Sequence, residues 1–235
     1  MKRILSGIIC AVTGVFFASV LSVGLWIYSI WRELPIIDND TYVLKSGNNG
    51  QPGELSGSDQ AVPHLLRMAL VASEDKLFYQ RPKKSTLACF VSLLVNYESG
   101  NSSIVSQLSK ISLRFEHSNP ITLSVKIVIL SCILQNKLSK DTIISNYANN
   151  IYLGNEITGV VLGSEYYFGN AINNLTLAQF ASLAALAKNP GIYISNRPVA
   201  MARRNQILDA MVGLDIVTSS EAEQAKLEPL TIRER

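Results

Sequence analysis

The longest uninterrupted apolar stretch of the chain lies close to its N-terminus. Residues 4–31 contain no charged side chain, and a helix needs only about 20 apolar residues to cross a bilayer. Lys2 and Arg3 precede this stretch and Trp31 closes it, so the positive-inside rule predicts a cytoplasmic N-terminus and a chain that continues outside. A cleaved signal peptide is the alternative, but its apolar core is usually about 7–15 residues long. The pattern favours an uncleaved membrane anchor over residues 1–31.

Beyond the anchor, the pattern of apolar and polar residues changes twice. Residues 32–61 are rich in Gly, Ser, Asn, Asp and Pro, a composition typical of a linker. From residue 62 onward, apolar residues recur at helical spacing, which predicts helices over residues 62–72, 121–137, 140–152, 177–188 and 198–213. No alternating run of the kind that marks a half-buried strand stands out. We therefore predict a mainly α domain over residues 62–235.

Two helix starts carry a local signature. Thr176 is followed three residues later by Gln179, and Thr218 by Glu221. In this capping-box arrangement each side chain bonds the backbone N–H of the other residue. Helices are therefore expected after Thr176 and after Thr218, and Pro190 is expected to stop the first of them.

Composition narrows the classes of partner. With 48% hydrophobic and 17% charged residues among 235, the chain can bury one core of ordinary domain size. A net charge of +3 is too small and too dispersed to favour nucleic acid, which leaves an anionic lipid or lipid-linked ligand as a candidate. Cys89 and Cys132 lie in apolar stretches, either as small buried side chains or as a disulfide formed outside the cytoplasm.

Two adjacent carboxylates, Glu74 and Asp75, interrupt an apolar run. Leu70 and Val71 precede Glu74 by four and three residues, so they share its helical face. A carboxylate on that face would be partly desolvated and more basic than one in water. The structural alternative is that Glu74 caps a helix or pairs with Arg67.

Five segments then follow one another in a familiar order: SEDKLFYQRP (73–82), GNSSIVSQLSK (100–110), LSKDTIISNYANNIYLG (138–154), GSEYYFGNAINNLTLAQFASLAALAKNP (163–190) and RPVAMARRNQILDAM (197–211). Together they resemble the peptidoglycan glycosyltransferases, membrane-anchored enzymes with a lysozyme-like fold that polymerise lipid II. The resemblance covers essentially the whole chain, and the length and single anchor are similar to the monofunctional members. It implies the bacterial inner membrane as location, a domain on the outer side, lipid II and membrane as partners, and contacts with cell-wall synthesis or division proteins.

The resemblance also assigns roles to residues of the first two motifs. It implies that Glu74 is the general base, with Asp75 orienting the loop rather than doing chemistry. The implied pyrophosphate-binding residues are Ser102, Ser103, Gln107 and Lys110. Hydroxyls, an amide and an ammonium suit that ligand because they donate several hydrogen bonds and carry a compact charge. A polar, Ser-rich turn is the structural alternative.

Arg203 and Arg204 match the paired arginines of the family's last motif. Each precedes an apolar residue, Ile207 or Leu208, by four positions, so at least one of them must point near the core. Arginine there could hold a diphosphate leaving group in bidentate fashion. A solvated basic helix face is the alternative.

The family's third motif is degenerate in this chain. Counting back from Leu138 puts Ile127 at the position of the family's second essential Glu and Gln135 at that of a further Glu. That essential Glu is thought to bind a metal or arrange the pyrophosphate, and isoleucine cannot ligate a hard cation. A divalent metal is therefore implied by the resemblance but doubtful here. Arg81 and Lys83 replace a family His and Gly, and their charges could neutralise part of a diphosphate.

Three functions are consistent with these residues. The first is a divergent glycosyltransferase that inverts the donor's anomeric carbon, and the second is a catalytically inactive relative that binds lipid II or a cell-wall assembly partner. The third is a lytic transglycosylase-like enzyme in which Glu74 would act as an acid. The Ser-rich motif and the pair of arginines argue against the third.

Overall fold

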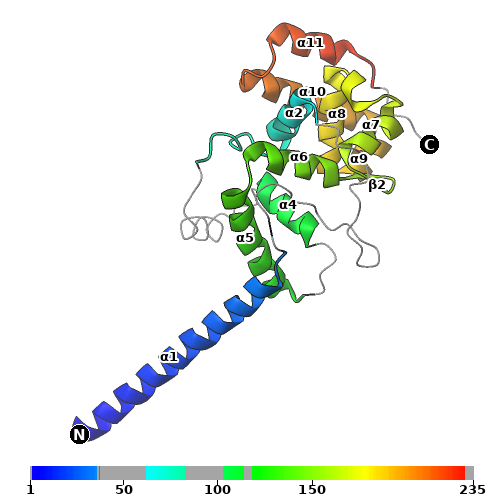
Figure 1. The fold of residues 1–235 in the computed structure, drawn as a ribbon. Coiled ribbons are helices and arrows are strands. Elements are labelled where there is room, and N and C mark those ends of the chain that lie inside the picture. Colours follow the sequence, from blue (N-terminus) through cyan, green and yellow to red (C-terminus); the bar gives the residue numbers. More distant parts are fainter. Residues whose placement is uncertain (1, 36, 38–61, 83–102, 114–117, 231–235) are drawn as a thin grey trace.

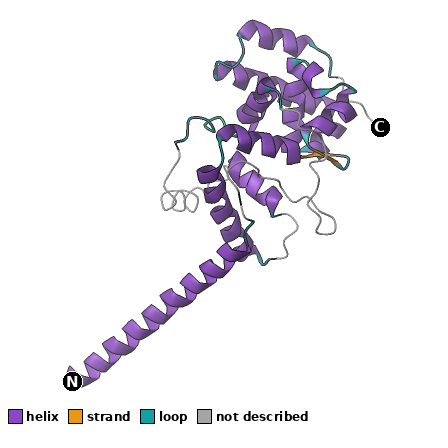
Figure 2. Cartoon of the chain, in the orientation of Figure 1, coloured by secondary structure: helices purple, strands orange, loops and turns teal. Residues whose placement is uncertain are grey.

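A computed structural model of the chain describes residues 2–35, 37, 62–82, 103–113 and 118–230. These parts are helical almost throughout, with a single short hairpin among them (Figures 1 and 2). The helices are α1 (Lys2–Glu33), α2 (His64–Glu74), α4 (Ile104–Ser112), α5 (Pro120–Lys137), α6 (Lys140–Asn150), α7 (Val160–Phe168), α8 (Leu177–Lys188), α9 (Pro190–Ser195), α10 (Arg197–Gly213) and α11 (Ser219–Leu227), with a 3-10 turn, η1, at Ile172–Asn174. The predicted mainly α class is confirmed.

Helix α1 extends away from the other helices (Figure 1). Its portion Val12–Glu33 is long and apolar enough to cross a membrane, and only 6% of its most apolar window is buried. Helix α5 passes the same test of length and composition, but 44% of it is buried within the protein. Exposed apolar side chains along α1 need a partner other than water, so α1 is the better candidate for a membrane span.

The C-terminal end of α1 docks onto α5. Ile30 and Leu34 are buried there, and Glu33 Oε2 forms an ion pair with Lys126 Nζ of α5 at 2.8 Å. The Lys126 side chain is itself buried, so this pair satisfies a charge that would otherwise be costly inside the protein. The junction joins the candidate anchor to the domain.

The centre of the domain is α8, which packs against α2 and α10 (Figure 1). Its buried positions include several alanines, and small side chains let neighbouring helices approach closely. The capping box of Thr176 and Gln179 is present at its start, as is that of Thr218 and Glu221 at the start of α11. Because these caps are local in sequence, both helix starts could be predicted.

One predicted boundary, the end of the helix over residues 140–152, was wrong. Helix α6 ends at Asn150, and an antiparallel hairpin follows, formed by β1 (Tyr152–Gly154) and β2 (Ile157–Thr158). Its strands are too short to show a period-2 pattern, and its turn places Asn155 and Glu156 at positive φ. The expectation that Pro190 stops α8 is confirmed, since α8 ends at Lys188. Pro190 also opens α9, where its missing N–H costs nothing.

Several predictions fall outside the described residues. They concern Lys83, Cys89, Ser102 and most of the linker over 32–61.

Cys132 is buried in α5 and disulfide-bonded, which fits the disulfide alternative for this residue.

Candidate active site

Glu74 is the last residue of α2, and its side chain is only 1% exposed. Its Oε2 accepts hydrogen bonds from Gln107 Nε2 at 2.9 Å and from Lys188 Nζ at 3.3 Å, while Oε1 accepts one from Ser73 Oγ at 3.3 Å. These donors offset the cost of burying a carboxylate. The structural alternatives do not hold, since Glu74 ends its helix and Arg67 pairs with Asp141 at 2.8 Å.

Gln107, on α4, connects Glu74 to a buried tyrosine. Its Oε1 accepts a hydrogen bond from the hydroxyl of Tyr147 on α6 at 2.9 Å, which leaves its Nε2 to donate to Glu74. Burial and the charge of Glu74 both raise the pKa of Tyr147, so the phenol stays a neutral donor. Tyr147 lies within the helix predicted over residues 140–152, and nothing local in the sequence indicated that its hydroxyl would reach this site.

Lys188 is the second residue that sequence reasoning missed. It ends α8, and its side chain is 51% exposed although its ammonium contacts the buried Glu74. A lysine in the last turn of a helix is ordinarily explained by the helix dipole. Only the packing of α8 against α2 brings it to Glu74, which lies 114 residues away in sequence.

Arg203, on α10, reaches the same place from another side. One guanidinium nitrogen, Nη2, donates to the backbone oxygen of Ser73 at 3.2 Å and to Ser73 Oγ at 3.1 Å. Since Ser73 Oγ in turn contacts Glu74, a single hydroxyl separates the arginine from the carboxylate. The structure thus brings together Glu74, Gln107 and Arg203 from the predicted set.

Arg204 requires a correction. It is fully buried, and it donates to the carbonyl oxygens of Glu228 at 2.7 Å and Lys226 at 2.8 Å, and to Asn205 Oδ1 at 3.0 Å. Burial lowers the pKa of its guanidinium. Its donors hold the end of α11. The predicted binding of a diphosphate by Arg204 was therefore wrong. The expectation that one of the two arginines would point into the core is confirmed.

Asp75 and Arg81 form a pair of their own. Arg81 Nη2 and Nη1 donate to the two oxygens of buried Asp75 at 2.5 and 2.8 Å, and the N–H of Ile104 donates to Asp75 Oδ2 at 3.4 Å. Asp75 therefore ties the turn after α2 to the start of α4, a geometry that orients the loop. Two donors of the Arg81 guanidinium are engaged with Asp75, and the side chain is 42% exposed. Its role in neutralising a diphosphate stays a prediction.

The remaining predicted binding residues on α4 are not gathered at Glu74. Ser103 is the N-cap of α4, where its side chain accepts a hydrogen bond from the N–H of Ser106 at 3.3 Å. Lys110 is exposed and follows Gln107 by three residues, on the same side of the helix. Ser103 is thus explained by capping, and the binding role of the exposed Lys110 stays a prediction.

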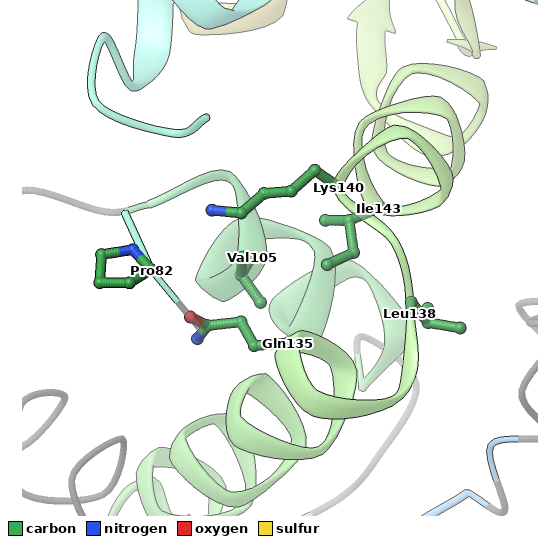
Figure 3. A pocket seen from close by; sticks show the side chains of 6 residues that line it. All are labelled: Pro82, Val105, Gln135, Leu138, Lys140 and Ile143. Atoms are coloured by element: carbon green, nitrogen blue, oxygen red, sulfur yellow. The ribbon is translucent and has the colours of Figure 1, made fainter. Parts of the chain in front are cut away.

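The degenerate positions belong to α5. Ile127 is 7% exposed and lies in the apolar core. Gln135 lines a small pocket together with Pro82, Val105, Leu138, Lys140 and Ile143. Figure 3 shows the polar ends of Gln135 and Lys140 extending toward Pro82, and Lys140 is engaged with the backbone oxygens of Phe78 and Arg81. Glu74 is not among the residues that line this pocket.

The groups around Glu74 do not fit a divalent metal. Hard cations need several oxygen ligands, but the groups that face this carboxylate are the donors Gln107 Nε2, Lys188 Nζ and Ser73 Oγ. The amide oxygen of Gln107 is bonded to Tyr147 instead. Within the described ranges, no three His, Cys, Asp or Glu side chains cluster as a metal site would need.

In this helical domain a buried carboxylate lies between a lysine and an arginine. Such an arrangement suits general-base chemistry on an anionic substrate. The family described as Transglycosylase matches residues 43–212. The chain therefore belongs to the transglycosylase family, and the resemblance inferred from its five segments is confirmed.

Individual relatives agree with this assignment. The chain is 28% identical to penicillin-binding protein 1A of Aquifex aeolicus over 99% of its own length and 34% of the relative's. It is 31% identical to penicillin-binding protein 1B of Vibrio cholerae, covering 73% and 23%, and 35% identical to penicillin-binding protein 1A of Neisseria gonorrhoeae, covering 72% and 22%. The chain thus spans about a third or less of each relative.

Among solved structures, the chain is similar to the crystal structure of penicillin-binding protein 1A from Haemophilus influenzae at 2.6 Å resolution. The TM-score is 0.37 at 23% sequence identity, and the match covers 56% of this chain and 17% of that one. At this score the likeness supports no conclusion about the site.

Proposed function

We propose that the protein is a membrane-anchored peptidoglycan glycosyltransferase-like protein that acts on lipid II in the synthesis of glycan strands. The observation that carries the proposal is the environment of Glu74, a buried carboxylate at a helix end with cations on two sides. Burial keeps water away from the carboxylate, and the cations suit a substrate that carries a diphosphate. Membership of the transglycosylase family supports the same reaction class.

In the proposed reaction Glu74 removes the proton from the 4-hydroxyl of the acceptor sugar. The hydroxyl oxygen then attacks the anomeric carbon of the donor with inversion, and the bond to the diphosphate breaks, so that undecaprenyl diphosphate leaves with the electron pair. Oε1 of Glu74 is the better placed proton acceptor, because it has one donor at 3.3 Å while Oε2 has two. Arg203 stabilises the charge of the departing group.

A second candidate function is binding without catalysis. It is favoured by Ile127, which puts an apolar side chain where the family has its second acid, and by Arg204, which is committed to backbone carbonyls. Such a protein would hold lipid II or a cell-wall assembly partner at the same site. General-base help alone is worth about a hundred- to ten-thousand-fold in rate, so a site with one acid can still turn over slowly.

Labelled lipid II separates these functions when it is given to the purified full-length protein. Glycan chains longer than the starting disaccharide support the glycosyltransferase. Saturable binding without chain growth supports the binding protein. Absence of both, with a folded protein, would refute the proposed substrate.

The proposed location is the bacterial inner membrane, with the N-terminus in the cytoplasm and the domain on the outer side. The charge-free stretch of α1 and the basic residues before it support this topology. A reporter enzyme that works only in the cytoplasm, fused after Arg235, should be silent. Activity of that fusion would show the reverse orientation.

A further inference from the structure

We propose that Glu33 and Lys126 are positioning residues, whose ion pair keeps the end of α1 docked on α5 and so fixes the orientation of the candidate active site over the bilayer. This inference rests on the proposed function, because it concerns access to a substrate held in that bilayer. Three observations carry it: the burial of the Lys126 ammonium, the level of the junction along α1, and the packing that connects α5 to Glu74.

Lys126 carries its charge into the interior of the protein. Its side chain is 3% exposed, whereas that of Glu33, its partner at 2.8 Å, is 60% exposed. Glu33 is the only acidic residue among the first 37 positions, and the sequence of α5 contains none. A buried ammonium that loses its anionic partner is strongly unfavourable. Without Glu33, the state in which α1 is detached and Lys126 is in water therefore becomes the more stable one.

The junction lies at the outer end of the candidate membrane span. Tyr28 and Trp31 are exposed and stacked there, with ring centroids 6.3 Å apart, and these residue types are enriched at membrane–water interfaces. Glu33 follows Trp31 by two residues, which is about 3 Å of helix rise. Ile30 and Leu34, at the same helix end, belong to the apolar core. Helix α1 thus meets α5 at the level where the span would leave the bilayer.

Packing connects this junction to Glu74. Helix α5 packs against α4 (Figure 1), and the buried hydroxyls of Ser131 and Ser109 share a hydrogen bond of 2.9 Å between these helices. Helix α4 in turn carries Gln107, which donates to Glu74. A docked α1 therefore holds the candidate active site in one orientation relative to the span. A lipid-linked substrate is confined to the same bilayer, so this orientation decides how well it reaches the site.

The test removes the carboxylate and compares two media. With Glu33→Gln, polymerisation of labelled lipid II by the full-length protein in proteoliposomes should fall by about ten- to a hundredfold, since a misplacement of about 1 Å can cost a hundredfold. In detergent micelles, where protein and substrate do not share one plane, the rate should stay close to that of the wild type. Arg32→Gln, which removes an exposed charge one position earlier, is the matched control and should behave like the wild type in both media.

A second substitution tests whether the buried charge is the cause. In the double variant Glu33→Gln, Lys126→Met the ammonium is gone, and replacing a buried ion pair by uncharged groups of similar volume is often neutral for stability. Helix α1 should then dock again, and polymerisation in proteoliposomes should recover. A double variant as impaired as Glu33→Gln would overturn the inference. Thermal unfolding of each variant checks that the domain is folded.

A measurement without catalysis separates this inference from the proposed function. Energy transfer from a fluorescent unnatural amino acid at Leu227, which is 84% exposed on α11, to acceptors in the lipid headgroups reports the orientation of the domain. Its efficiency should change in Glu33→Gln and return in the double variant. Unchanged efficiency in Glu33→Gln overturns the inference, and so does an equal loss of polymerisation in micelles and proteoliposomes. Wild-type protein that polymerises in neither medium refutes the proposed catalysis, and energy transfer then decides the role of the ion pair by itself.

Discussion

The end of α2 and the middle of α5, the two places to which the resemblance assigns an acid, differ in what they hold. At the end of α2, the Glu74 carboxylate accepts hydrogen bonds from donors on α4 and α8. In α5, Ile127 packs in the core, while the neighbouring Lys126 pairs with Glu33 of the candidate anchor. The first region thus gathers polar groups around a buried acid, and the second packs the core and holds the candidate anchor.

This contrast implies that the two regions should respond differently to substitution. Changes at the end of α2 should alter binding or catalysis and leave the fold intact, because its groups are polar and lie at a helix end. Changes in α5 should alter stability, because its side chains fill the core.

The largest effect is expected for Glu74→Gln. If the wild type polymerises lipid II, the variant should lose about a hundred- to ten-thousand-fold in rate, because the amide cannot accept the proton of the acceptor hydroxyl. Lipid II binding should persist. Glu165→Gln, on the exposed face of α7, is the matched control and should polymerise normally. Unchanged polymerisation by Glu74→Gln would remove Glu74 from the centre of the site.

Ile127→Glu should lower the free energy of unfolding by more than about 3 kcal/mol, since it places a carboxylate in an apolar environment without a partner. Ile127→Leu keeps the volume and should cost less than about 1.5 kcal/mol. Urea denaturation of the two variants measures both values. A stable Ile127→Glu variant with faster polymerisation would show that α5 still belongs to the catalytic centre.

The adjacent arginines allow a sharper comparison. Arg204→Met should lower the free energy of unfolding by about 2–5 kcal/mol, because two carbonyl oxygens and a side-chain oxygen lose a buried charged donor. Arg203→Met should leave stability within about 1 kcal/mol, because the arginine is only partly buried, and should weaken lipid II binding instead. The opposite pattern would reverse the roles assigned to these residues.

The smallest effect is expected for Tyr147→Phe. Loss of its hydroxyl frees the amide of Gln107 to turn, so polymerisation should fall by about five- to tenfold while stability falls by about 1 kcal/mol. Tyr152→Phe, at an exposed tyrosine in β1, is the control. If Tyr147→Phe changes stability without changing polymerisation, the orientation of Gln107 does not matter for the reaction.

The elements that could be predicted from sequence are those set by neighbouring residues. Helix starts at Thr176 and Thr218 follow from capping boxes spanning four positions, and the charge-free N-terminal stretch forms a long exposed helix. Glu74 could be singled out because carboxylates interrupt an apolar face. The hairpin after α6 could not be predicted, because strands of three and two residues carry no periodic signal.

The sequence by itself determined that the chain is helical and that an apolar helix opens it, and it singled out a carboxylate and two arginines as candidates for a site. Only the tertiary structure decided which of these groups meet. Consecutive residues of a helix point about 100° apart, so Arg203 reaches Ser73 beside Glu74 while Arg204 turns into the core. Lys188 joins the site for a related reason, because the packing of α8 on α2 sets distances that no local pattern records.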